Sequence, residues 1–208
     1  MSIPSRVRTP LTLEQFLKLP DIDEHPAREY IDGKVEVKVA AQKKHCMIQL
    51  RMIQDLNEFA EPSFVGMAFP ELRCTFAGRS IVPDVAFLLT DHIDVDSEGV
   101  LVNETFRPPD LHIEIASPDQ PAKRHRDRLQ FSTAKGCPLG WFIDPERRTV
   151  EVFRADGSHT RIPHDGVLEG EPVLPGYSVT AATVFGWLKL RVVRPRDEEQ
   201  AGPGGPMS

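Results

Sequence analysis

Two apolar runs that each carry one carboxylate constrain the fold of this chain more than any other feature. They cover residues 82–89 (VPDVAFLL), with Asp84, and residues 111–116 (LHIEIA), with Glu114. Both runs are short and rich in β-branched or aromatic side chains, which is typical of buried strands. Because side chains alternate along a strand, the apolar residues of the second run should share one face, and Glu114 should lie on the other face with His112.

Asp84 and Glu114 both need a partner if the two strands are buried, because an unpaired carboxylate in an apolar interior is strongly destabilising. A metal ion is the simplest partner that the two side chains could share. The alternative is that each carboxylate stands at a strand end and reaches water or an arginine. Taken alone, the two runs favour this alternative.

The size and charge of the chain indicate one globular domain. Its 208 residues suffice for a single domain that mixes helices and strands. We expect a flexible start at residues 1–9, one domain at 10–190 and a disordered Pro/Gly/charged tail at 191–208. A net charge of -6 argues against a generally basic surface but permits a local basic cleft. No apolar run approaches the ~20 residues that span a bilayer, and no apolar signal core is present, so we expect a cytoplasmic protein without a membrane partner.

Cysteine spacing points to no disulfide framework or zinc site. Cys46, Cys74 and Cys137 lie far apart, with no pair at a metal-binding spacing. We therefore expect buried structural thiols.

Local patterns place further elements on either side of the two apolar runs. An Asp-Gly pair at Asp32 predicts a hairpin over residues 28–39. In it Val35, Val37 and Val39 alternate with charged residues, so one face should be buried and the other exposed to water. Apolar residues at helical spacing predict a helix over 43–60. Residues 90–110 are polar and acidic and should form a surface excursion between the two central strands.

Two basic features could have either an ordinary structural role or a functional one. His45 stands near the start of the expected helix at 43–60, where a surface or capping role is more common than a ligand role. The cluster KRHRDR at residues 123–128 opens another expected helix, and such runs usually form a solvated face. Because this helix follows the Glu114 strand directly, Arg124 and Arg128, one helical turn apart, could instead face an anionic substrate.

Several short motifs, in their order and spacing, resemble the Uma2 family (DUF820) of the PD-(D/E)XK restriction-endonuclease-like superfamily. The resemblance covers residues 12–188, nearly the whole expected domain. Its parts are REYIDGK at 28–34, His45, PDV at 83–85, PDLHIEIASP at 109–118, Asp127-Arg128, and GCP at 136–138 followed by WFIDP at 141–145.

The resemblance implies an α/β fold of the mixed α+β kind: a restriction-endonuclease-like core in which helices flank a mixed sheet, with added hairpins. It implies a divalent metal, Mg²⁺ or Mn²⁺, held by Asp84, Glu114 and the backbone carbonyl of Ile115. Glu29 would point into the same cleft as a further ligand or water-orienting group, although an exposed position on an edge hairpin is the alternative. Oxygen ligands of this kind suit magnesium.

This chain departs from the resembled pattern at three positions. These departures affect the expected catalytic turnover and leave the expected metal ligands in place. Superfamily enzymes usually carry a lysine two residues after the strand glutamate, where this chain has Ala116. The resembled family typically moves that lysine onto the next helix, at the position of Arg128. An arginine there can stabilise an oxyanion but cannot act as a base. The aromatic residue one turn further on is replaced by Ser132.

Three functions remain open from the sequence. The first is a metal-dependent endonuclease, a hydrolase of phosphodiester bonds with DNA as the expected substrate. Its catalytic residues would be Asp84, Glu114, Glu29 and Arg128, and Arg124, Arg128 and His45 would bind the nucleic acid. The second is a nuclease-fold protein that binds nucleic acid or a protein partner without cleavage. The third is a structural domain in which Asp84 and Glu114 form ion pairs with Arg79, Arg124 or Arg128. A homodimer is left open.

Overall fold

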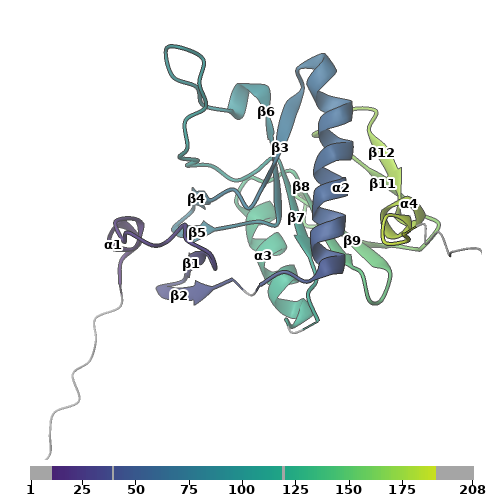
Figure 1. Cartoon of the computed structure of the whole chain (residues 1–208), viewed down its shortest axis with the longest axis horizontal. Coiled ribbons are helices and arrows are strands. Elements are labelled where there is room, and N and C mark those ends of the chain that lie inside the picture. Colours follow the sequence, from purple (N-terminus) through teal and green to yellow (C-terminus); the bar gives the residue numbers. More distant parts are fainter. Residues whose placement is uncertain (1–10, 39, 119, 191–208) are drawn as a thin grey trace, which may run out of the picture.

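The computed structural model describes residues 11–38, 40–118 and 120–190 (Figure 1). The expected flexible start at 1–9 and disordered tail at 191–208 lie outside the described residues. The helices are α1 (Leu13–Leu17), α2 (Lys43–Ala60), α3 (Ala122–Ala134) and α4 (Ala181–Gly186), with 3-10 turns η1 (Glu61–Ser63) and η2 (Thr90–His92). The strands are β1 (Arg28–Ile31), β2 (Lys34–Val37), β3 (Gly66–Pro70), β4 (Cys74–Phe76), β5 (Arg79–Ile81), β6 (Val85–Leu89), β7 (Leu111–Ile115), β8 (Leu139–Asp144), β9 (Thr149–Arg154), β10 (His159–Ile162), β11 (Val167–Glu169) and β12 (Ser178–Thr180).

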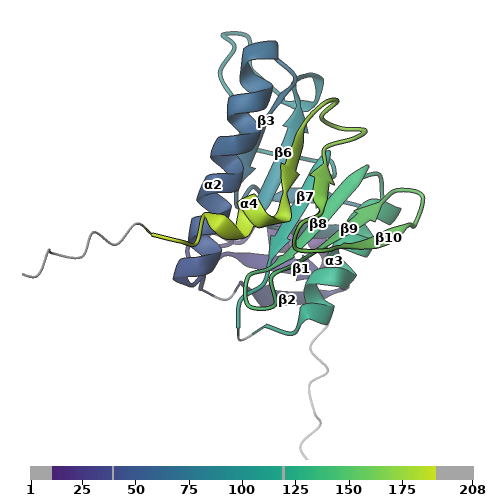
Figure 2. The ribbon, with the colours of Figure 1, turned by 90° about the vertical axis from the view of Figure 1, so that its right-hand side faces the viewer.

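A six-stranded mixed sheet forms the centre of the molecule, with the order β10-β9-β8-β7-β6-β3. Only β7 and β8 run parallel among these neighbours, and α3 makes the crossover between them. Helix α2 packs on one face of the sheet with α4 beside it, and α3 covers β7, β8 and β9 from the other face (Figures 1 and 2). The expected mixed sheet flanked by helices is therefore confirmed.

The alternation expected for residues 111–116 is present in β7. Leu111, Ile113 and Ile115 belong to the main core cluster, which also contains the buried residues of α2. The residues between them, His112 and Glu114, bond to side chains of α3 on the opposite face. Strand β7 thus presents an apolar surface to α2 and a polar pair to α3.

Helix α3 approaches β8 closely because residue 140 is a glycine. A Cβ at Gly140 would stand 3.0 Å from Cδ2 of Leu129, which is tighter than an ordinary contact. Leu129 packs there with Phe142 and Phe153 in a small second core between α3 and the sheet. This close approach brings the polar face of α3 over β7.

A second, four-stranded sheet with the order β2-β1-β5-β4 carries the N-terminal hairpin. The hairpin turns at Asp32 and Gly33, which have φ of 48° and 81° as an Asp-Gly turn requires. The valine face, expected to be the buried one, is not buried, because Val35 and Val37 are 41% and 50% exposed. Val39 lies outside the described residues. The buried residues of this hairpin lie on β1 instead, where Glu29 faces the ion pairs described below.

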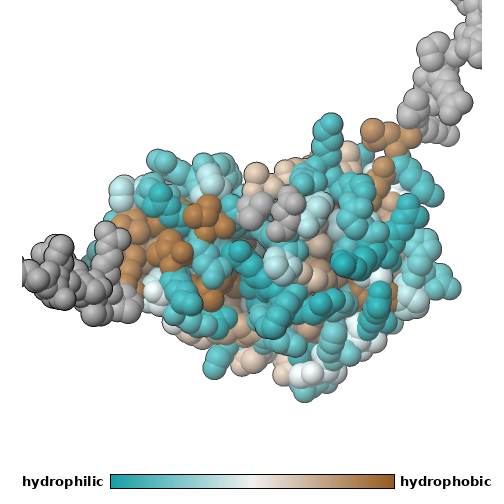
Figure 3. Space-filling model, turned by 90° about the horizontal axis from the view of Figure 1, so that it is seen from below, coloured by the Kyte–Doolittle hydropathy of each residue, from teal (hydrophilic) through white to brown (hydrophobic). Residues whose placement is uncertain are grey.

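Residues 90–110 form the expected excursion between β6 and β7, with η2 and an isolated bridge between Val95 and Leu101. The face of the molecule in Figure 3 is mostly hydrophilic, with hydrophobic side chains between the polar ones. No helix within the described ranges is long and apolar enough to cross a membrane.

Candidate metal and nucleic-acid site

Asp84 stands immediately before β6 and is held rigidly against β7. The paired register of the two strands begins at Val85 with Ile113, so Asp84 lies just outside the paired part of β6. The carboxylate is 2% exposed, and its Oδ2 accepts a hydrogen bond of 2.7 Å from the backbone N–H of Ile115. The Asp84 carbonyl accepts another from Nε2 of Gln49, at 2.7 Å. Only Oδ1 is left to face other charged groups.

Two basic side chains approach Oδ1 of Asp84. The ammonium of Lys38 donates to it at 2.8 Å. The ring atom Nε2 of His45 lies 3.5 Å from the same oxygen but makes no hydrogen bond, although His45 is only 6% exposed. The other ring nitrogen of His45 lies 3.3 Å from Oγ of Ser117.

Lys38 is a cation at neutral pH in this setting. Its burial lowers its pKa, but the carboxylates of Asp84 and Glu114 outweigh that effect and raise the pKa above its ordinary value. Lys38 therefore serves as a charge partner of Asp84 and not as a proton acceptor.

Glu114 is surrounded by donors. Its Oε1 lies 2.7 Å from Nε2 of His112 and 3.0 Å from Nε of Arg128, and its Oε2 lies 2.9 Å from Nδ1 of His125. Burial raises the pKa of Glu114, but the charge of Arg128 and the bonds from both histidines hold it well below its ordinary value. Ser132, which replaces the expected aromatic residue, lies 2.7 Å from Nδ1 of His112.

Arg128 and Glu29 form a buried bidentate pair beside Glu114. Both terminal nitrogens of Arg128 donate to the Glu29 carboxylate, and one also donates to the carbonyl of Val82 at 3.1 Å. Glu29 is 0% exposed and accepts a further bond of 2.6 Å from the Val82 N–H. Burial lowers the pKa of Arg128, but Glu114, Glu29 and Asp84 raise it above the ordinary value. The exposed position considered for Glu29 is therefore wrong.

Arg124 lies nearer the surface than Arg128. Its guanidinium is 2.8 Å from Oε2 of Glu36 and 3.7 Å from Oε2 of Glu29, with the side chain 29% exposed. It lines a pocket of about 370 Å³ together with Arg79, Lys123 and Arg128. Three carboxylates line this pocket as well, those of Asp32, Glu36 and Asp127. Of the two arginines expected to face a substrate, only Arg124 reaches the surface.

The predicted residues therefore fall into two adjoining groups. Asp84 and His45 lie together on the α2 side with Lys38, whereas Glu114, Arg128 and Glu29 lie together beneath α3. Within the described parts of the chain, no cluster of three or more His, Cys, Asp or Glu is arranged to hold a metal ion. A ligand role for the Ile115 carbonyl stays a prediction.

The donors present nevertheless fit a cation at Asp84 in one respect. His45 Nε2 is a buried nitrogen without a hydrogen-bond partner, and it lies next to a carboxylate oxygen. A buried nitrogen without a hydrogen-bond partner destabilises the fold unless another group binds to it. A divalent cation is a group that an imidazole nitrogen and a carboxylate oxygen could both bind.

Sequence reasoning missed three residues of this network: Lys38, His112 as a partner of Glu114, and His125. The signal for His112 was present, because strand alternation put it on the Glu114 face. His125 stands three positions before Arg128 on one helix, a spacing that places two side chains on one face. Lys38 gave no local signal, since its partner lies 46 positions away.

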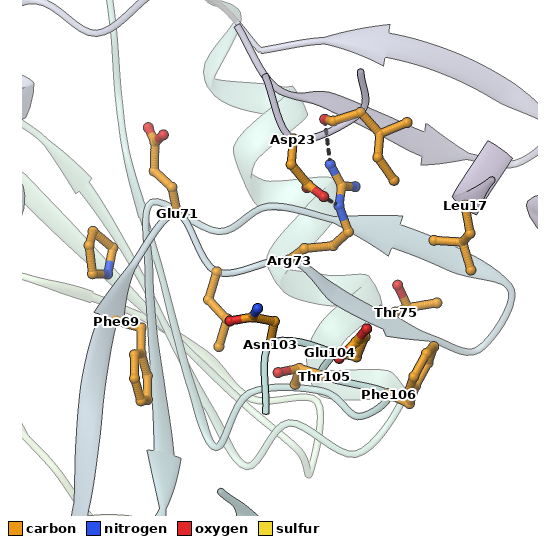
Figure 4. Close-up of a pocket in the computed structure, with 13 residues that line it drawn as sticks. Leu17, Asp23, Phe69, Glu71, Arg73, Thr75, Asn103, Glu104, Thr105 and Phe106 are labelled. Carbon is orange, nitrogen blue, oxygen red and sulfur yellow. Dashed lines mark hydrogen bonds and ion pairs between the residues drawn. The ribbon is translucent and has the colours of Figure 1, made fainter. Parts of the chain in front are cut away.

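A larger pocket of about 820 Å³ lies beside this network, between the end of α1, strands β3 and β4, and residues 103–106 (Figure 4). Arg73 crosses it and bonds to Asp23 and to the carbonyl of Ile22. Glu71 lines its edge and points away from Thr105 and Phe106. Through Glu71 this pocket adjoins the Lys38–Asp84 pair.

The fold and these carboxylates define a domain of the restriction-endonuclease-like class. The family model of Uma2, described as "Putative restriction endonuclease", matches residues 13–183. This chain belongs to the Uma2 family. It is similar to the crystal structure of a putative nuclease belonging to DUF820 from Anabaena variabilis ATCC 29413, with 34% identity and a TM-score of 0.82. That alignment covers 86% of this chain and 100% of the other. A search of curated proteins gave no match.

Proposed function

We propose that this protein hydrolyses phosphodiester bonds of nucleic acid, with DNA as the expected substrate, and that the reaction depends on Mg²⁺ or Mn²⁺. The observation that carries the proposal is the pairing of a buried carboxylate, Asp84, with an unpartnered buried nitrogen, His45 Nε2, at 3.5 Å. Membership of a family described as nuclease-like supports it. We also propose that the protein is cytoplasmic and can form a homodimer.

Asp84, with His45 beside it and Glu114 on the next strand, would hold the cation. When bound, a divalent cation supplies charge stabilisation for the scissile phosphate and lowers the pKa of an attacking water. The backbone N–H of Ile115 orients Asp84 so that Oδ1 faces Lys38 and His45. The charge of Arg128, together with the bonds from His112 and His125, keeps the pKa of Glu114 low and the side chain ionised. Arg124 at the surface would contact a phosphate of the substrate.

Lys38, Arg128 and Glu114 are not suited to remove a proton from water. The raised pKa values of Lys38 and Arg128 keep both side chains charged at neutral pH. Glu114 has a lowered pKa and is a weak base. The proton would therefore leave to bulk solvent or to a phosphate of the substrate.

One observation favours the second candidate, binding without cleavage. Both oxygens of Glu114 and all three nitrogens of the Arg128 guanidinium lie against groups of the protein itself. To share a cation, Glu114 would have to give up at least one of these partners. A site closed in this way suits a protein that keeps the fold and has lost turnover.

A nicking assay separates the two candidates. The purified protein is incubated with supercoiled DNA, single-stranded DNA and RNA in Mg²⁺, Mn²⁺ or EDTA. We expect metal-dependent cleavage that Asp84→Asn abolishes. The matched control is Asp110→Asn: Asp110 is also a buried aspartate that accepts a backbone N–H, but it stands at the opposite end of β7. Cleavage in EDTA, or by Asp84→Asn at the parent's rate, would contradict the proposal. Binding without cleavage would establish the second candidate.

A further inference from the structure

Lys38 occupies the side of Asp84 at which a cation would have to bind. Oδ2 of Asp84 is taken by the Ile115 N–H, so Oδ1 is the oxygen that remains. The Lys38 ammonium sits on that oxygen at 2.8 Å, within the same small space as the unpartnered His45 Nε2. The aspartate is thus already neutralised by a cation that the chain itself supplies.

An ammonium and a divalent cation would compete for this oxygen. Each would lie within about 3 Å of Oδ1, so the two positive charges would be close neighbours and would repel each other in a partly buried site. The Lys38 side chain is 12% exposed and that of Asp84 is 3% exposed, so water screens this repulsion poorly. A divalent cation would therefore bind Asp84 more tightly if the ammonium moved away.

The structure provides a second position for the ammonium. Oε1 of Glu71 lies 3.9 Å from Nζ of Lys38, and the backbone N–H of Glu71 donates to the Asp84 carbonyl at 3.3 Å. Lys38 and Glu71 both line a pocket of about 530 Å³ that also includes His25, Pro26 and Ala27. The backbone of Lys38 stays anchored, because its N–H donates to the carbonyl of Ala27 at 2.9 Å. Only the flexible side chain has to swing.

We propose that Lys38 is a tethered counter-ion that competes with the divalent cation for Asp84 and moves to Glu71 when the cation binds. This inference rests on the proposed metal requirement of the site. It adds that Lys38 sets the affinity of the site for the metal. The built-in cation stabilises the metal-free protein and weakens metal binding. His45 Nε2 gains a partner only in the metal-bound state.

The test is Mn²⁺ binding to the metal-free full-length protein, followed by the electron paramagnetic resonance signal of free aqueous Mn²⁺. Lys38→Met removes the competing charge and keeps most of the side-chain volume. We expect it to bind Mn²⁺ about tenfold more tightly than the parent, as for loss of one charge-assisted hydrogen bond. Adding Asp84→Asn to Lys38→Met should abolish this binding.

Lys44→Met is the matched control. Lys44 also bonds a carboxylate at 2.7 Å, that of Glu146, but both side chains are more than half exposed. The substitution changes the net charge by the same amount near the start of α2 and leaves Asp84 untouched. It should alter Mn²⁺ affinity by less than about twofold, because exposed charges are screened.

Each outcome decides one or both proposals. Tighter binding by Lys38→Met than by the parent supports the counter-ion. Equal or weaker binding by Lys38→Met overturns it, and the metal requirement stands if the parent binds. If Lys38→Met binds Mn²⁺ and the parent does not, the result supports Lys38 as a competing counter-ion and overturns the proposed metal dependence of the parent. Absence of binding in both proteins overturns both proposals.

Stability measurements keep the test valid if Lys38→Met folds poorly. Lys38→Gln keeps a donor and lacks the charge, so it should show the same tightening with a smaller loss of stability. In the absence of metal both variants should melt at a lower temperature than the parent, and Mn²⁺ should raise their melting temperature by more than it raises that of the parent. An equal or smaller Mn²⁺ shift in both variants would overturn the inference.

Discussion

Arg128 on α3 donates from both terminal nitrogens to the carboxylate of Glu29 on β1, across 99 positions of sequence. Both side chains are buried, and this pair joins the N-terminal hairpin to the helix that covers β7. Loss of either partner leaves the other charge in the interior without compensation. The pair is therefore a structural connection as well as part of the candidate site.

Replacement of Arg128 should destabilise the fold. Arg128→Ala leaves Glu29 and Glu114 without their shared cation, and we expect a loss of about 3–5 kcal/mol in the free energy of unfolding. Arg128→Lys keeps the charge, loses the bidentate geometry and should cost less. Urea unfolding measures both. Arg126→Ala on the same helix, which removes a half-exposed bidentate partner of Glu151, should cost about 1 kcal/mol or less. Equal losses at both positions would contradict the buried pair.

The same pair predicts strong coupling between Glu29 and Arg128. Glu29→Gln and Arg128→Met should each destabilise, but the double variant should lose less than the sum, because the uncompensated charge is gone. We expect a coupling energy of about 1–3 kcal/mol in a double-mutant cycle. Additive losses would show that the two side chains do not interact in solution.

The depressed pKa of Glu114 predicts an acid-dependent stability. The unfolded glutamate binds a proton below about pH 4.3, while the folded one stays ionised to lower pH. The unfolded state then binds more protons, so the contribution of Glu114 to stability falls as pH drops through this window and is constant above it. Glu114→Gln should flatten the slope by up to about 1.4 kcal/mol per pH unit. Unfolding between pH 3 and 6 measures this, and an unchanged slope would contradict the assignment.

The three cysteines should differ in reactivity. Burial raises the pKa of Cys74 and of Cys137 to about 12, whereas Cys46 is exposed. The native protein should therefore give one rapidly reacting thiol with Ellman's reagent and three after unfolding, because the thiolate is the reactive form. Cys46→Ser should remove the rapid phase. The sequence-based expectation of three buried thiols was wrong for Cys46.

Local sequence pattern sufficed for the parts of the fold that depend on neighbouring residues. Alternation along residues 111–116 placed Glu114 opposite the apolar face, and the Asp-Gly pair located the hairpin turn. The buried side of that hairpin could not be predicted, because burial of Glu29 depends on Arg128, a residue of another element. A valine alternation is ordinarily the stronger sign of a buried face, and here a tertiary ion pair overrides it.

The partners within the candidate site were harder to predict than its carboxylates. Asp84 and Glu114 stood out because charges are rare in apolar strands. Lys38 did not stand out, since a lysine after a hairpin strand is ordinarily exposed. Its contact with Asp84 joins the segment after β2 to the residue before β6, 46 positions away, which no local rule specifies.

Binding of a divalent cation by Asp84 can be seen by anomalous scattering from crystals soaked in Mn²⁺. We predict a manganese peak in bonding contact with Oδ1 of Asp84, with His45 Nε2 as a further ligand and the Lys38 ammonium displaced toward Glu71. Asp84→Asn crystals soaked identically should show no peak. A parent crystal without manganese at Asp84, in which Lys38 still bonds to Oδ1, would contradict the account.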